Sequence, residues 1–82
     1  MAYTKDEIRT VLFQAIGKAT KRDPATLSPE LKWLDDLDFK SVQGMKVCGI
    51  LNYSFKITVP LTDLIKCDTL EDAVEMLDSK VN

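Results

Sequence analysis

Apolar residues recur at intervals of three and four positions in three segments of the chain, which is the spacing that places side chains on one face of an α-helix. The first segment spans about residues 5–21, the second spans about residues 41–54, and the third follows Asp68 or Thr69. Thr4, with Glu7 three residues later, forms a capping-box pattern ahead of the first segment. No pair of alternating strands and no internal repeat is visible, so the chain is predicted to be all-α.

The connections between these segments are uneven in length. Residues 23–40 form a long loop, in which Pro29 suits the first position of a single helical turn over residues 28–31. Ile57-Thr58-Val59-Pro60 should be extended because the residue before a proline avoids the α region, and residues 61–65 leave room for one or two turns. We therefore expect an antiparallel four-helix bundle with a long first loop and a short third helix.

Eighty-two residues suffice for one domain, which we place over residues 1–82. Trp33 should close one end of the bundle with its N–H bonded to a carbonyl, or else serve as a binding hot spot. The predicted buried residues share the inner faces of the helices and the extended segment: Leu12, Ile16, Val47, Leu51, Phe55, Val59 and Val74.

Composition excludes several classes of function. The chain has no histidine, which removes histidine-based catalysis and the usual Cys/His zinc sites. A net charge of −2 gives no electrostatic footprint for nucleic acid. Cys48 and Cys67 are too far apart for a redox or zinc pair and are expected to be buried thiols, so no metal site is predicted. No apolar stretch reaches about 18 residues and the N-terminus is polar, so a cytoplasmic, reduced protein is expected.

The run Leu37-Asp38-Phe39-Lys40-Ser41-Val42 resembles the signature of the acyl carrier protein family, in which a serine begins the second helix. Phe55 and the extended segment over residues 57–60 stand where that family has an aromatic residue and an Ile-Pro or Val-Pro step. The similarity continues through residues 66–74 and so covers essentially the whole chain.

This resemblance implies a function for Ser41. Its hydroxyl would carry 4′-phosphopantetheine through a phosphodiester, and the arm would hold acyl groups as thioesters for other enzymes, so the chain itself would not be an enzyme. A phosphate at this position would meet the unpaired N–H groups of a helix N-terminus. The simpler alternative is that Ser41 only caps the second helix.

Two departures from the family pattern bear on partners. Asp38 replaces the usual glycine and Lys40 the usual aspartate, which puts recognition by a common phosphopantetheinyl transferase in question. No acid lies between Asp38 and Asp63, whereas fatty-acid carriers present acids along the second helix. We therefore predict a monomeric carrier with dedicated acyl-loading and acyl-processing enzymes in a fatty-acid-like or specialised polyketide-type pathway. An unmodified carrier-like interaction module is the alternative. The predicted partner-binding residues surround Ser41: Asp38, Phe39, Lys40, Val42, Gln43, Met45 and Lys46.

Gly44 and Gly49 both fall inside the second helix, where each costs about 0.5 to 1 kcal/mol relative to alanine. Gly44 is interpreted as giving the arm or a partner close access to the backbone, and Gly49 as making room in the bundle; ordinary helix packing explains both equally well. Met45 and Cys48 are candidates for lining an acyl cavity, or for plain core positions.

Overall fold

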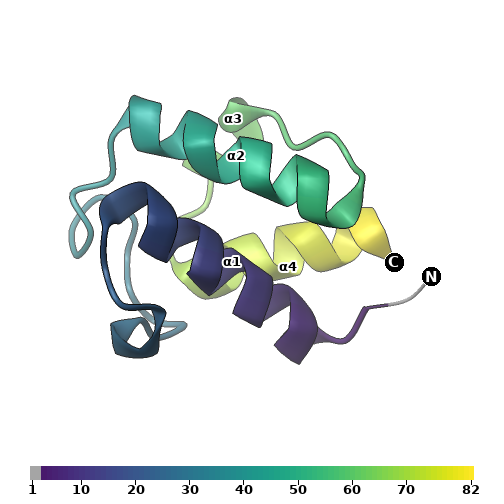
Figure 1. Cartoon of the computed structure of the whole chain (residues 1–82), viewed down its shortest axis with the longest axis horizontal. Coiled ribbons are helices and arrows are strands. Elements are labelled where there is room, and N and C mark those ends of the chain that lie inside the picture. The colour runs from purple at the N-terminus through teal and green to yellow at the C-terminus, as the bar shows by residue number, and fades with distance from the viewer. Residues whose placement is uncertain (1–2) are drawn as a thin grey trace.

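The computed structural model describes residues 3–82 as four α-helices joined mainly by turns and loops (Figure 1). The helices are α1 (Lys5–Thr20), α2 (Ser41–Phe55), α3 (Leu61–Ile65) and α4 (Leu70–Val81), with one 3₁₀ turn, η1 (Pro24–Thr26). In Figure 1, α1 runs opposite to α2 and α4. Over residues 3–82 the only strand-like pairing is a single antiparallel bridge between Lys32 and Thr69. The predicted all-α bundle with a long first loop and a short third helix is confirmed.

The N-termini of α1 and α4 are fixed by reciprocal capping boxes. Thr4 Oγ1 accepts from the Glu7 amide at 3.1 Å, and Glu7 Oε1 accepts from the Thr4 amide at 2.9 Å. At α4 the cap is Thr69 rather than Asp68: its Oγ1 accepts from the Asp72 amide at 3.2 Å. These bonds satisfy amide groups that the helices themselves leave unpaired.

The core is continuous and apolar, and within residues 3–82 it contains no buried polar or charged side chain. All seven residues predicted to be buried lie in it, each no more than 6% exposed. They come from α1, α2, α4 and the extended segment before α3. Leu64 of α3 lies in the same cluster, so one core holds all four helices together.

The long loop is tied to the start of α4 rather than left free. The Leu70 amide donates to the Leu31 carbonyl at 2.9 Å, and the Glu71 amide donates to the Pro29 carbonyl at 2.9 Å. Trp33 is only 4% exposed, and its indole N–H donates to the Thr69 carbonyl at 3.0 Å. Trp33 is therefore the predicted anchor of the loop and lies in the core, not on a surface that a partner protein meets.

The helical turn of this loop lies elsewhere than predicted. We expected it over residues 28–31, but those residues form a simple turn, and the 3₁₀ turn is η1 at Pro24–Thr26. Both sites offer a proline at the first helical position. The Asp23 carboxylate decides between them, because it accepts from the Ala25 amide at 3.0 Å and caps the turn.

Ion pairs join α4 to its neighbours. Lys5 pairs with Glu75 at 2.6 Å and Arg9 with Glu71 at 3.0 Å, both between α1 and α4.

No helix within residues 3–82 combines the length and apolarity needed to span a membrane.

Candidate functional site

Ser41 is the first residue of α2 and is exposed. The cap position belongs to Lys40, whose backbone is extended and whose amide donates to Gln43 Oε1 at 2.8 Å. Gln43, in the first turn of α2, thus accepts the hydrogen bond from the backbone amide of the cap residue. The alternative that Ser41 caps α2 is wrong, because its backbone is already helical and, over residues 3–82, its hydroxyl has no hydrogen-bond partner. The hydroxyl is available for chemistry.

The start of α2 is a favourable place for an anion. The first-turn amides of Ser41, Val42 and Gln43 precede the first intrahelical bond, which the Gly44 amide donates to the Lys40 carbonyl at 2.9 Å. The first turn carries no acidic residue, and α2 is 15 residues long, so the positive end of its dipole is not offset locally.

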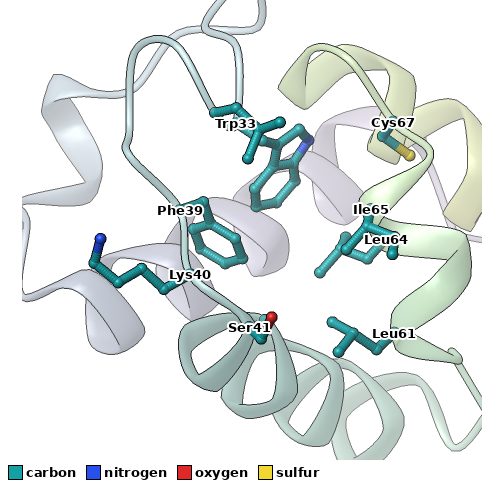
Figure 2. Close-up of a pocket in the computed structure, with 10 residues that line it drawn as sticks. Trp33, Phe39, Lys40, Ser41, Leu61, Leu64, Ile65 and Cys67 are labelled. Carbon is teal, nitrogen blue, oxygen red and sulfur yellow. The ribbon is translucent and has the colours of Figure 1, made fainter.

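A cavity of about 120 Å³ lies beside Ser41, between the N-terminal end of α2, the long loop and α3 (Figure 2). The Trp33 and Phe39 rings meet edge to face in its wall, with centroids 4.7 Å apart. Figure 2 shows Leu61, Leu64 and Ile65 of α3 opposite these rings and the Lys40 side chain directed away from the cavity. An apolar space therefore adjoins an exposed hydroxyl.

Gly44 leaves room for the close packing of α3 and Phe39 against α2. A Cβ at this position would lie 2.6 Å from Leu61 Cδ1 and 3.4 Å from Phe39 Cε2. Ordinary helix packing, the alternative interpretation, therefore accounts for Gly44, whereas close access for the arm or a partner stays a prediction. At Gly49 a Cβ would meet nothing within 4 Å, so the interpretation that Gly49 makes room in the bundle is wrong.

The two residues proposed to line an acyl cavity do not line this one. Met45 is exposed, because it lies on the outer face of α2, and Cys48 is packed in the core. The thiol in the cavity wall is that of Cys67, after α3. Burial, followed by the charges of Asp72 and Asp63, raises the pKa of Cys67 to about 11. That thiol is thus protonated and unreactive near neutral pH. The sequence signal for the α3 wall was the cluster of apolar residues after Pro60.

Asp38 adopts a left-handed backbone conformation, with φ at 48°. Glycine takes this conformation without strain, and aspartate is among the few other residues that adopt it readily. Asp38, which stands where the resemblance places a glycine, can therefore keep the left-handed backbone conformation that a glycine would adopt there. The Asp38 carboxylate also pairs with Lys40 Nζ at 3.3 Å, with both side chains exposed.

The seven residues predicted to bind partners divide into two groups. Phe39 and Gln43 turn inward, Phe39 to the cavity wall and Gln43 to the helix start. The rest are exposed around Ser41: Asp38, Lys40, Val42, Met45 and Lys46. Over residues 3–82, no cluster of three potential metal ligands is present.

A family model describing the phosphopantetheine attachment site matches residues 10–77, which is most of the chain. The chain belongs to the phosphopantetheine-binding carrier family. It is a carrier protein and not an enzyme, and the prosthetic group of this family is covalently attached 4′-phosphopantetheine. The site fits such a group, because an exposed hydroxyl without a partner stands at a helix start free of acids.

Three curated relatives match this chain over most of its length. The acyl carrier protein of Micrococcus luteus is 29% identical over 75 residues, which is 92% of this chain and 93% of that protein. The acyl carrier protein of Myxococcus xanthus is 28% identical over 74 residues, covering 90% and 94%. The meromycolate extension acyl carrier protein of Mycolicibacterium smegmatis is 30% identical over 74 residues, covering 90% and 75%. These similarities support a carrier of fatty-acid-like or specialised lipid pathways.

Proposed function

We propose that the 4′-phosphopantetheine arm is attached to Ser41 and that this carrier presents thioester-bound acyl intermediates to dedicated enzymes, as a monomer in the cytoplasm. The observation that carries the assignment is the state of Ser41: an exposed hydroxyl without a partner at the first residue of α2. A phosphate on that oxygen would be stabilised by the first-turn amides and by the positive end of the helix dipole.

The experiment is modification by a phosphopantetheinyl transferase with coenzyme A, followed by intact-mass measurement. We expect one addition of roughly 340 Da to the wild-type chain and none to Ser41→Ala. Ser54→Ala is the matched control, because Ser54 is an exposed serine of the same helix, and it should be modified like the wild type.

Three outcomes contradict the assignment. Modification of Ser41→Ala would place the arm on another residue. An unchanged mass with every transferase tried, at a wild-type melting temperature, would favour the alternative of an unmodified interaction module. Loss of helicity in Ser41→Ala beyond local fraying would mean that the serine is mainly structural.

The cavity beside Ser41 supports a short or compact acyl end as the sheltered cargo. Its volume of about 120 Å³ is somewhat below the roughly 150 Å³ of a dry engineered cavity that binds benzene. Trp33, the only tryptophan, lies in the wall of this cavity, so its fluorescence should report whether an acyl end occupies the cavity. We expect butyryl loading to shift the Trp33 emission and dodecanoyl loading to add no further shift. A shift that keeps growing with chain length would contradict this limit.

A further inference from the structure

Large exposed apolar side chains are unevenly distributed among the helices of the described chain. Over residues 3–82, the large ones lie on α2, on α3 or in the loop before α2, and none lies on α1 or α4: Leu34, Val42, Met45, Tyr53 and Ile65. On α2, Val42, Met45 and Tyr53 are 78%, 65% and 87% exposed. With Gly49 they follow helical spacing, at positions 42, 45, 49 and 53, and so form one stripe along the helix, the α2 stripe.

Gly49 interrupts the α2 stripe with a gap. Met45 lies one turn before it and Tyr53 one turn after it, and nothing within 4 Å would meet a Cβ at Gly49. Glycine in a helix interior costs about 0.5 to 1 kcal/mol relative to alanine. Gly44 has an internal reason for that cost, in its contact with Leu61, whereas packing within the described chain supplies none for Gly49.

Charge along the α2 stripe is of one sign. Lys46 lies three residues before Gly49 and Lys56 follows the end of the helix, while no acidic residue occurs from residue 39 to residue 62. Lys40 is paired with Asp38, but within residues 3–82 neither Lys46 nor Lys56 makes an ion pair. A partner surface that is complementary to the α2 stripe would be apolar and would carry carboxylates around its edge.

We propose that the α2 stripe docks an amphipathic helix of a partner enzyme, which places an apolar side chain in the gap at Gly49 and carboxylates opposite Lys46 and Lys56. Side chains that fit into gaps between residues one turn apart are the ordinary mode of helix packing. The α2 stripe begins next to Ser41, and an enzyme acting on the arm has to approach this end of α2. Only this last step rests on the proposed attachment at Ser41.

A second copy of the chain fits the α2 stripe less well. In a two-fold contact centred on Gly49, the Lys46 and Lys56 side chains of each copy would meet a helix that offers no carboxylate, because no acid occurs from residue 39 to residue 62. The α2 stripe, positive on both copies, is therefore not complementary in charge to itself.

Two helical peptides serve as probes, each with a leucine and phenylalanine stripe, one rimmed by glutamates and the other by lysines. They are titrated into the ¹⁵N-labelled chain without its arm. We expect the acidic peptide to bind at about millimolar concentration or tighter and to shift the amide signals of Val42, Met45, Gly49 and Tyr53. Binding should weaken at about 0.5 M salt, where screening is strong. The lysine-rimmed peptide should not bind.

The gap itself is tested by Gly49→Leu, with Gln14→Leu as the matched control, since Gln14 is an exposed position inside α1. Filling the gap should weaken binding of the acidic peptide by about tenfold, whereas the control should leave it unchanged. Gly49→Ala should weaken binding less while raising the melting temperature, because its Cβ meets only solvent. If Gly49→Ala raises the melting temperature and still weakens peptide binding, the loss of binding cannot be a result of unfolding.

Several outcomes overturn the proposal: equal binding of the two peptides, no binding of the acidic peptide, signal shifts on α1 and α4 instead of α2, or concentration-dependent dimerisation through α2. Because the peptides do not need the arm, the two proposals fail separately. Peptide binding to a chain that no transferase modifies would overturn only the attachment. A chain that a transferase modifies but whose α2 stripe does not bind the acidic peptide would overturn only the docking proposal.

Discussion

The α1–α4 side of the molecule and the α2–α3 side differ in what they leave exposed. On the α1–α4 side, charges from the two helices pair with each other, as Lys5 does with Glu75 and Arg9 with Glu71. On the α2–α3 side, Val42, Met45 and Ile65 stand in solvent, and Lys46 has no ion pair within residues 3–82. The two sides therefore differ most in exposed apolar side chains, which within residues 3–82 lie on the α2–α3 side and in the loop before α2.

This difference does not come from a difference in stability. Exposed ion pairs contribute only about 0 to 1 kcal/mol each, so the α1–α4 pairs are a modest part of what holds the bundle together. Exposed side chains such as Val42 and Tyr53 contribute still less to folding. Folding therefore supplies no reason for the apolar surface of α2, which is in keeping with the proposed docking of a partner helix.

The largest expected effect is on the core that both sides share. Phe55, at the end of α2, is buried and meets the Tyr3 ring edge to face, with centroids 5.0 Å apart. Phe55→Ala should lower the free energy of unfolding by about 3 to 5 kcal/mol, measured by urea denaturation. Because small domains have only about 5 to 15 kcal/mol in total, the variant is expected to be partly unfolded. A wild-type midpoint would mean that the two sides do not depend on one core.

The sequence predicted the parts of this structure that depend on local pattern. Helical spacing placed the inner faces, with Val47 and Leu51 in the core, and the capping box at Thr4 placed the start of α1. Ser41 was identified from its neighbours and stands at the helix start as expected. The sequence did not reveal that Cys67 and α3 form the cavity wall, because tertiary packing brings them there across the chain.

The same limit explains the misassigned residues. Met45 and Cys48 both lie on α2 near Ser41, so sequence distance made them candidates for the cavity, but the helix turns one outward and the other into the core. The left-handed backbone at Asp38 was hidden for a different reason: aspartate also suits ordinary loops, so its presence does not specify a positive φ.

Reversing the positive charge at the start of α2 tests the charge difference between the two sides. Lys40→Asp with Lys46→Glu should speed modification by a transferase that grips carriers through basic residues, by about tenfold at low salt, because opposite charges steer association. Initial rates at low and high ionic strength measure this effect. The gain should shrink with salt, since the Debye length falls from about 10 Å at 0.1 M to about 3 Å at 1 M.

The matched control reverses two lysines at the other side of the molecule. Lys18→Glu with Lys21→Asp changes the net charge equally, at the exposed end of α1. It should leave the modification rate nearly unchanged. Equal gains in both double variants would mean that net charge, and not the surface of α2, governs recognition.

A smaller effect compares one left-handed residue on each side. Lys21, which ends α1, has φ at 59°, and Asp38, which precedes α2, has φ at 48°. Replacing either residue with glycine should raise the free energy of unfolding by a few tenths to about 1 kcal/mol, measured by thermal denaturation. Only Asp38→Gly should also change the rate of transferase modification, because only Asp38 adjoins Ser41. A change in that rate from Lys21→Gly would contradict the division of the molecule into two sides.

The smallest expected effect concerns Cys67, which lies between α3 and α4, where the two sides meet. Its thiol donates to the Asp63 carbonyl at 3.5 Å, and burial raises its pKa to about 11 from 9.0. A thiol whose folded pKa is raised stabilises the fold fully below the unfolded pKa, and this contribution is lost as pH rises toward the folded pKa. The window is therefore about pH 9 to 11.

Urea denaturation of the wild type and of Cys67→Ala, under reducing conditions at a series of pH values, isolates this contribution from the lysines that titrate in the same range. The difference in unfolding free energy between the two proteins should narrow from pH 8 to pH 11, by no more than about 1 kcal/mol because the thiol is only partly buried. A difference that stays constant or widens would mean that solvent reaches the sulfur freely and that the cavity wall beside Ser41 is open at Cys67.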